Sequence, residues 1–263
     1  MQKLFLLSVL SGILFLSSCN TNDGTTSLIV RLTDSPGDFE KVLIDIQAVE
    51  VHAEAWADND NENWVTLNTN PGVYDLLQLT GGVSAVIADD QFPAGTISQL
   101  RLILGENNAV VIDGVEYELK VPSGSTSGLK VLVQADLVEG IAYSILLDFD
   151  AAKSVVEAGS SGKFLLKPVI KAITNATDGA IKGVVLPASE TVAVYAINGS
   201  DTLSTSFAVE NNSDYFLSGL PTGNYTVGFD PGELSDYQSV VLNDVGVTVG
   251  EVTTLDDISL TLK

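Results

Sequence analysis

The sequence predicts an all-β protein with two β-sandwich domains in tandem, the first of which carries one or two short helices. Apolar residues mostly alternate with polar ones or form short β-branched runs, whereas helical periodicity is rare. Turn residues separate the runs, in the second half roughly every 8–12 residues, as in sandwiches. With 45% hydrophobic and 17% charged residues, the chain can bury cores and does not have a disordered composition.

Residues 1–18 predict a cleaved signal peptide. Lys3 precedes an apolar stretch at 4–16, which is shorter than the roughly 20 residues that a transmembrane helix needs. The letters LSSC at 16–19 resemble a bacterial lipobox, which implies that Cys19 becomes the first mature residue and carries lipid. An ordinary secretory signal with an incidental cysteine is the alternative. Residues 19–27 are small and polar, which predicts a flexible tether between the lipid and the fold.

The charge of the chain excludes one class of partner. There are 34 acidic and 12 basic residues, for a formal net charge of −22. Such a chain is repelled by nucleic acid and by anionic lipid, so nucleic-acid binding is not expected. Cys19 is the only cysteine, so no disulfide can form within the chain.

The first domain is expected over residues 28–174. Its alternating runs predict strands at 27–34, 41–56, 64–68, 98–106, 108–121, 129–138, 142–150 and 163–174. Val42, Ile44 and Ile46 should share one face of their strand, and Asp113-Gly114 predicts a tight hairpin. Residues 74–82 read as a short helix or strand. Residues 150–159 predict a short helix that begins at Asp150 and ends at Gly159.

The second domain is expected over residues 178–263, after a boundary at 175–179. Its runs predict strands at 179–186, 191–197, 204–210, 213–220, 223–231, 238–250 and 253–262. Pro221 and Gly223 should form a tight turn, after which Tyr225 and Val227 point to one face.

Each domain resembles a known family. The letters GAIKGVV, VAVYAING and YFLSGLPTGNYTVGF in the second resemble the carboxypeptidase regulatory-like domains, which have a transthyretin-like (prealbumin-like) sandwich grouped with carbohydrate-binding-like folds. In the first domain, RLTDSPGDFEKVLIDIQAVEVH, FPAGTISQLRLIL and LLDFDAAKSVVEAGSSGKFLLKPVIKA are similar to the DUF4382 family of bacterial lipoprotein domains. That resemblance implies a surface-attached β domain, most like those of Bacteroidetes, and implies no activity.

Catalytic constellations based on cysteine or histidine are not expected. Cys19 is assigned to lipid, and His52 is the only histidine, so thiol, triad and conventional zinc sites lack their ingredients. Calcium is the better metal candidate, because Asp58, Asp60 and Glu62 alternate in one loop and could converge on a hard cation. The alternative is a solvated acidic turn.

Two further groups of residues could serve carbohydrate. Trp56, Trp64 and Tyr74 could form an exposed aromatic platform, although a structural cross-strand pair of the two tryptophans is the alternative. A hydrolase would need two carboxyl groups in a cleft. The candidate pairs are Asp34/Asp38, Asp89/Asp90, Asp148/Asp150 and Asp256/Asp257.

The expected protein is therefore a lipid-anchored outer-membrane lipoprotein, periplasmic or surface-exposed, without a catalytic residue set or a cofactor other than calcium. Its expected role is that of a non-enzymatic binding, adhesion or structural module. A glycan is the first candidate ligand on fold analogy and an envelope protein the second. The alternative is a carbohydrate-active hydrolase that uses paired carboxylates.

Overall fold

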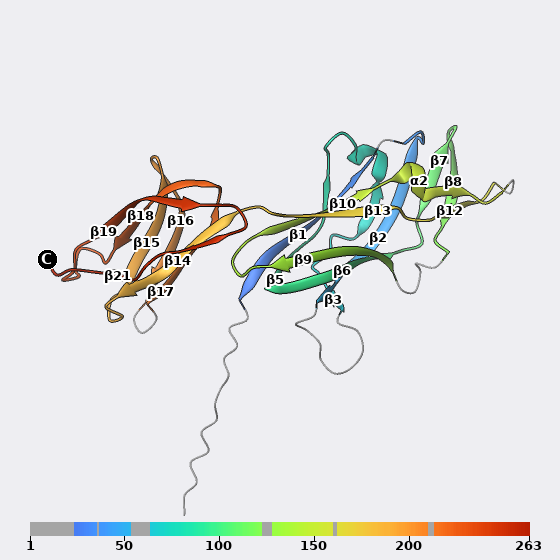
Figure 1. The fold of residues 1–263 in the computed structure, drawn as a ribbon. Coiled ribbons are helices and arrows are strands. Elements are labelled where there is room, and N and C mark those ends of the chain that lie inside the picture. Colours follow the sequence, from blue (N-terminus) through green and yellow to red (C-terminus); the bar gives the residue numbers. More distant parts are fainter. Residues whose placement is uncertain (1–23, 36, 54–63, 123–127, 160–161, 210–212) are drawn as a thin grey trace, which may run out of the picture.

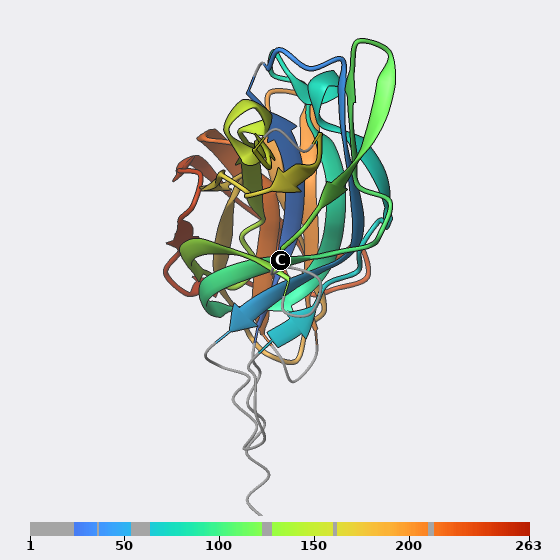
Figure 2. The same ribbon diagram turned by 90° about the vertical axis from the view of Figure 1, so that its right-hand side faces the viewer.

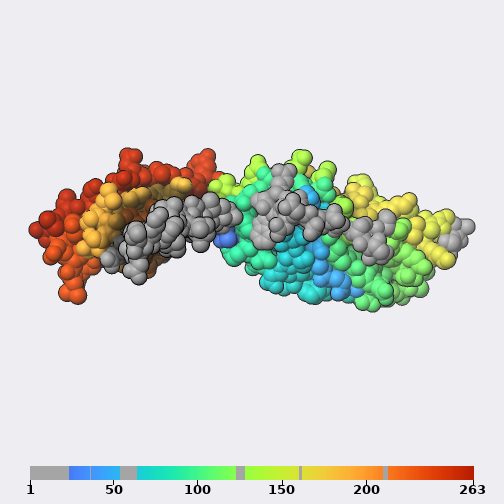
Figure 3. Space-filling model, turned by 90° about the horizontal axis from the view of Figure 1, so that it is seen from below, coloured from blue at the N-terminus to red at the C-terminus, as the bar shows by residue number. Residues whose placement is uncertain are grey.

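The computed structural model describes residues 24–35, 37–53, 64–122, 128–159, 162–209 and 213–263. Nearly all regular structure in these residues is β, and it forms two β-sandwich units that lie end to end (Figure 1). The space-filling view shows the same elongated outline from below (Figure 3). No helix in the described segments is long and apolar enough to span a membrane.

The first sandwich packs two sheets face to face. One sheet has the strand order β13-β10-β1-β5, and its β1 and β10 run parallel. The other has the order β11-β12-β8-β7-β2-β6-β9, with β3 and β4 also paired to β2. The strands are β1 (Thr25–Asp34), β2 (Lys41–Ala53), β3 (Trp64–Thr66), β4 (Gly72–Asp75), β5 (Ala85–Pro93), β6 (Gly95–Leu104), β7 (Ala109–Ile112), β8 (Val115–Lys120), β9 (Leu129–Leu137), β10 (Tyr143–Phe149), β11 (Val155–Glu157), β12 (Phe164–Leu166) and β13 (Ile170–Ala176).

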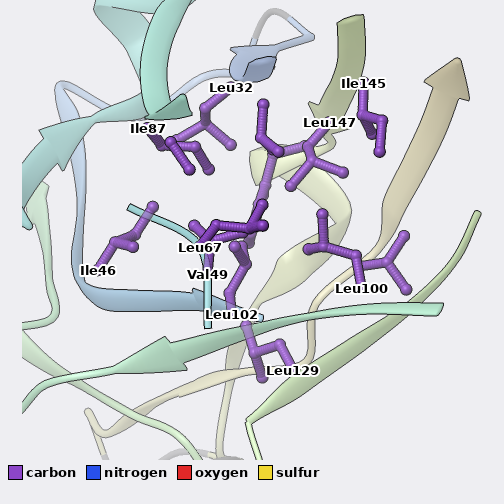
Figure 4. Packing of buried hydrophobic residues seen from close by; sticks show 14 of the residues in the cluster. Leu32, Ile46, Val49, Leu67, Ile87, Leu100, Leu102, Leu129, Ile145 and Leu147 are labelled. Carbon is purple, nitrogen blue, oxygen red and sulfur yellow. The ribbon is translucent and has the colours of Figure 1, made fainter. Parts of the chain in front are cut away.

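Alternation along the strands builds the core between these sheets. In β1 every second residue from Thr26 to Asp34 is buried, so the strand presents a continuous row to the second sheet. Figure 4 shows leucine, isoleucine and valine side chains from both sheets meeting in the interior, including Leu32 and Leu147 from one sheet and Val49, Leu100 and Leu102 from the other. Most residues of this cluster are fully buried, and each such aliphatic side chain contributes about 1.5–3 kcal/mol through burial.

The long strand β2 changes its buried face halfway along. Ile44 and Ile46 face the core as predicted, but the register shifts between Ile46 and Ala48, and Val49 and Val51 become the buried residues. Such an irregularity inserts one extra residue into the strand. Asp45, which the alternation placed on the outer face, is nevertheless only 2% exposed, because Gln47 and the turn that carries Asn107 cover its side chain.

Side chains that bond to Asp45 stabilise this irregular point. Its Oδ2 accepts hydrogen bonds from the Asn107 backbone N (3.1 Å) and from Asn107 Nδ2 (2.9 Å), and its Oδ1 accepts one from Gln47 Nε2 (2.5 Å). The Asp45 backbone N donates to Asn108 Oδ1 at 2.9 Å. The buried carboxylate therefore fastens the turn between β6 and β7 to the centre of the sheet.

The local turn predictions for the first sandwich are largely confirmed. β7 and β8 form a hairpin around Asp113 (φ 50°) and Gly114 (φ 74°), the positive values that a type I′ turn requires. Asp150 caps the helix α2 (Ala151–Ser154) by accepting from the Lys153 backbone N at 3.0 Å. The helix is shorter than predicted, because the β-branched pair at 155–156 continues as strand β11.

Two predicted segments divide differently from the expectation. Residues 74–82 contain the end of β4, the 3-10 helix η2 (Leu76–Leu79) and a turn. Residues 163–174 split into β12 and β13, which belong to different sheets. The break falls around Pro168, where Ser154 Oγ accepts from the Val169 backbone N at 2.8 Å.

The second sandwich also packs two sheets. One has the order β17-β14-β20, with β21 also paired to β14, and the other has the order β16-β15-β18-β19. The strands are β14 (Gly179–Leu186), β15 (Val192–Asn198), β16 (Asp201–Ala208), β17 (Asp214–Leu220), β18 (Gly223–Asp230), β19 (Val240–Val247), β20 (Val252–Thr254) and β21 (Ile258–Ser259). The last predicted strand, 253–262, is thus two short ones. In the view along the long axis, the first sandwich overlaps the second (Figure 2).

The core of the second sandwich follows the predicted pattern closely. Tyr225 and Val227 are both buried, as expected from the turn at 221–223. The Tyr225 hydroxyl donates to the Pro221 carbonyl oxygen at 2.8 Å, which closes that turn. Tyr215 packs edge-on against Phe229 with ring centroids 5.4 Å apart. Aromatic residues thus form the centre of this smaller core.

Candidate functional site

The residues predicted to carry lipid and calcium cannot be compared with the structure. Cys19, Asp58, Asp60 and Glu62 all lie outside the described residues, as does Trp56. Within the described segments there is no group of three or more histidine, cysteine, aspartate or glutamate side chains that could hold a metal ion. The site is therefore sought among the described grooves and polar clusters.

The junction between the sandwiches is closely bonded. Asp178 Oδ1 accepts a hydrogen bond of 2.7 Å from the Ala142 backbone N, which precedes β10 in the first sandwich. The Thr177 backbone N donates to the Ala142 carbonyl oxygen at 2.8 Å, and the Gly250 backbone N donates to the Asp178 carbonyl oxygen at 2.8 Å. These bonds link the first sandwich, the connecting residues and the segment before β20.

An aromatic contact completes this junction, which we call the joint (residues 138–142, 176–180, 216 and 250–252). Gly140 has φ 72°, and a Cβ atom placed there would lie 2.3 Å from ring atoms of Phe216. Only glycine allows this backbone conformation together with so close an approach. Ala180, Phe216 and Val252 belong to or pack against the hydrophobic cluster of the first sandwich. The joint therefore combines hydrogen bonds with apolar burial.

A groove of about 780 Å³ lies beside the joint. Its floor is the outer face of the sheet β17-β14-β20, where Lys182 of the central strand is directly opposite Phe216 on one side and Thr254 on the other. The wall includes Val138 and Glu139 from the first sandwich. The remaining lining residues are Gly183, Val184, Ser206, Asp214, Tyr215, Val252, Leu255 and Asp257. The volume is in the range of about 300–1,000 Å³ that small-ligand sites occupy.

The structure brings together acidic residues from two of the pairs named from the sequence. Asp34, at the end of the buried row of β1, lies near Asp148 and Asp150, because β1 and β10 run parallel and Asp34 is opposite Phe149. Burial, followed by the charges of Asp150 and Asp148, raises the pKa of Asp34 to about 6. The pKa of Asp150 shifts in the opposite direction: its side-chain hydrogen bond with Lys153 lowers that pKa.

The Asp34 carboxyl group is poorly placed for catalysis. Its Oδ1 accepts from the Ala151 backbone N at 2.9 Å, and its Oδ2 is buried without a hydrogen-bond partner among the described residues. The residue is only 5% exposed, so a polysaccharide chain cannot reach it in this conformation. Of the other named acids, Asp90 accepts from the Asn68 backbone N at 2.8 Å, and Asp257 lines the groove.

The predicted aromatic platform is not assembled as expected. Trp64 pairs with His52 of β2, whereas Tyr74 pairs with Ile44 of the same strand. Because eight residues separate Ile44 from His52, Trp64 and Tyr74 lie about 25 Å apart along β2. The Arg101 guanidinium carbon is 4.3 Å from the Trp64 ring centroid, and Lys130 Nζ is 5.6 Å from it. Cations thus occupy positions that a stacked sugar would need.

His52 contacts a serine and a tryptophan on the face of the second sheet of the first sandwich. Its Nδ1 is 2.8 Å from Ser98 Oγ, and its ring meets Trp64 edge-on with centroids 5.2 Å apart. The ion pair between Arg101 and Glu50 lies on the same face of the sheet. We call this set of residues, with Lys130, the Trp64 cluster.

The fold defines a two-domain, all-β protein with a groove beside its joint. The first of its domains identifies the family: the chain belongs to the DUF4382 family, described as a domain of unknown function, whose family model matches residues 25–168. A search of curated proteins finds no relative of the chain.

The comparison with solved structures gives only partial likenesses. They include the shaft pilin SpaA of Lactobacillus rhamnosus GG, with 8% identity and a TM-score of 0.25 over 91% of this chain and 98% of that one. GBS52, the minor pilin of Streptococcus agalactiae, has 13% sequence identity and a TM-score of 0.26, and the match covers 90% of this chain and 97% of that one. The Bacillus anthracis TIE protein has 9% sequence identity and a TM-score of 0.24. The match covers 90% of this chain but only 34% of that protein's chain, so this chain spans about a third of its length. TM-scores this low do not define a shared fold.

Proposed function

We propose that the protein is a lipid-tethered, non-enzymatic structural and binding module of the cell envelope, with carbohydrate as its ligand class. The observation that carries this proposal is the joint. Asp178, Ala142 and Phe216 hold two sandwiches end to end, so that the molecule is a stiff spacer with a groove in its side. A stiff two-domain body suits a module that presents a surface at a distance from a membrane.

The attachment proposed at Cys19 places this module on the outer membrane, facing the periplasm or the exterior. Lipid chains there would each contribute about 0.8 kcal/mol per buried CH2, which makes anchoring effectively permanent for a multiply acylated cysteine. The expected result is incorporation of labelled palmitate into the parent and loss of label in Cys19→Ala. Unchanged labelling or membrane fractionation in the variant would contradict the attachment, and protease shaving of intact cells distinguishes the two faces of the membrane.

The second sandwich is proposed to be a carboxypeptidase regulatory-like domain, on the motif around Gly219-Leu220-Pro221 and the Tyr225 contact that closes the turn. An envelope protein is the second candidate partner. For the ligand class, a glycan array of the full chain in detergent provides the test. Binding to one or more carbohydrates is expected, and uniform silence would leave a spacer without a carbohydrate ligand.

Calcium remains a proposal for the loop that carries Asp58, Asp60 and Glu62. Three carboxylates at alternating positions offer the oxygen ligands that calcium prefers. Millimolar calcium should then raise the melting temperature of the full chain, and a chelator should reverse the shift. The triple variant with asparagine at Asp58 and Asp60 and glutamine at Glu62 should show no shift. A melting temperature that calcium leaves unchanged in the parent would contradict this site.

The hydrolase alternative has one observation in its favour, the raised pKa of Asp34 beside Asp148 and Asp150. A carboxyl group that is protonated near neutral pH can serve as a general acid. The burial of Asp34 argues against this role. Release of reducing sugar by the parent, abolished in Asp34→Asn, would favour the hydrolase; no release by either protein is the result that the binding function predicts.

A further inference from the structure

We infer that the groove beside the joint binds a neutral saccharide of a few rings. This inference rests on the carbohydrate-binding function proposed above and assigns that function to a particular site. It follows from the charge pattern of the lining, its apolar strip and its position across two domains.

The charges of the groove are arranged with a cation in the middle and anions around it. Lys182 projects from the central strand β14 on the exposed face, and Asp214 and Asp257 are the acidic residues of the lining that lie on the second sandwich; Glu139 also lines the groove, but its carboxyl group lies against Gly24. A saccharide hydroxyl both donates and accepts hydrogen bonds, so it can bond to a lysine ammonium and a carboxylate at once. One cation, Lys182, and two anions, Asp214 and Asp257, leave the groove with a net negative charge, which disfavours acidic sugars.

The apolar part of the lining suits the other surface of a sugar ring. Val184, Val252 and Leu255 are partly buried and lie among the charged residues. The C–H faces of a pyranose are apolar and gain free energy from contact with such side chains. Phe216 contributes less to this contact, because its ring edge already covers Gly140.

The position of the groove gives binding a mechanical consequence. Val138 and Glu139 come from the first sandwich, whereas the floor belongs to the second. A saccharide that touches both walls adds contacts across the joint and is expected to reduce exchange of the Ala142 amide hydrogen, which donates to Asp178. Binding and joint stiffness are therefore linked.

The Trp64 cluster provides the contrasting site. Arg101 and Lys130 lie directly opposite each other in the sheet and both approach the indole ring. Glu50 pairs with Arg101, so Lys130 leaves the cluster with a net positive charge, which favours an anionic ligand over a neutral one. Acidic and neutral sugars therefore separate the two sites.

The test uses the full chain in detergent and isothermal titration with defined hexasaccharides. The neutral set comprises α- and β-linked glucan, mannan and xylan fragments, and oligogalacturonate is the acidic probe. Asp257→Asn and Lys182→Ala should each weaken binding of a neutral saccharide about tenfold, the effect of losing one hydrogen bond to a charged group. Asp256→Asn is the matched control, because this exposed neighbour removes the same charge outside the lining. Lys130→Ala reports on the Trp64 cluster.

Each outcome has a defined meaning. Weakening in the groove variants with parental affinity in Asp256→Asn and Lys130→Ala supports the inference. Neutral binding that the groove variants leave unchanged overturns the groove while the carbohydrate-binding function stands. Binding of oligogalacturonate alone, lost in Lys130→Ala, assigns binding to the Trp64 cluster and overturns the groove. If no probe binds and the glycan array also shows no binding, both the groove and the carbohydrate-binding function are overturned. Thermal melts of all variants identify any that fail to fold.

Discussion

The two sandwiches differ in what they bury. The first buries five polar or charged side chains, namely Thr26, Asp34, Asp45, Asn108 and Ser154, whereas the described buried residues of the second are apolar or tyrosine. In the first, buried oxygen atoms fasten irregular segments, such as the turn held by Asp45. In the second sandwich, tight turns and aromatic contacts hold the irregular segments and the core in place instead. The first sandwich should therefore respond to pH and to loss of single polar groups, and the second to changes of volume.

The largest expected effect concerns Asp45. Replacing it by alanine leaves buried donors of Gln47 and Asn107 without their acceptor, which should lower the free energy of unfolding by about 3 kcal/mol. Both tryptophans of the chain fall within the sequence range of the first domain, and Trp64 lies on β3 of its sandwich, so denaturant unfolding followed by tryptophan fluorescence reports on this change. Asp45→Asn keeps one acceptor oxygen and should lose less. Equal stability of parent and Asp45→Ala would mean that the buried polar contacts do not organise this sandwich.

The second-largest expected effect comes from adding a methyl group to the packed interior of the second sandwich. A Cβ atom on Gly183 would lie 2.7 Å from the Tyr215 hydroxyl oxygen, so Gly183→Ala should cost about 2 kcal/mol in unfolding free energy. The tyrosine hydroxyl is itself buried and has no hydrogen-bond partner among the described residues, and burial raises the pKa of Tyr215 to about 12. Tyr215→Phe should therefore stabilise the domain by about 1 kcal/mol and reduce the cost of Gly183→Ala. Additive effects in the double variant, measured by chemical denaturation followed by far-ultraviolet circular dichroism, would argue against this contact.

A smaller, pH-dependent effect is expected at Asp34. Its pKa rises from 3.8 to about 6 on folding, so the folded state binds the proton more tightly and loses stability as the pH rises through this window. Asp34→Asn keeps an oxygen for the Ala151 amide and removes the buried charge. The variant should be more stable than the parent by about 1 kcal/mol at pH 8. This value is smaller than the full effect of the pKa shift, because solvent close to the carboxyl group screens part of its charge. The advantage should vanish below about pH 4; an advantage that is the same at both pH values would contradict the buried-charge account.

Local chemistry explains which features the sequence could predict. The Asp113-Gly114 hairpin, the Asp150 cap and the inward pair Tyr225 and Val227 depend on neighbours in the chain, and all three are confirmed. The DUF4382 resemblance of the first domain is confirmed as well.

Contacts between distant residues account for what the sequence did not reveal. The burial of Asp45 in β2 depends on Asn107, some sixty residues away, and Asp34 meets Asp148 only because β1 and β10 pair in parallel. The groove likewise combines residues from two domains, so no motif marks it. Gly140 and Phe216 are both at the joint, but the sequence does not mark either residue, because only their contact in the fold brings them together.

The most direct test of this account is amide hydrogen exchange at Ala142, resolved by nuclear magnetic resonance, in the parent and in Asp178→Ala. If the joint holds the two sandwiches as one body, the Ala142 amide is protected in the parent and exchanges much faster in Asp178→Ala, while Asp178→Asn, which keeps the acceptor oxygen, stays close to the parent. An Ala142 amide that exchanges as fast as an exposed loop in the parent, or at the same rate in all three proteins, would contradict a stiff joint and the binding module built on it.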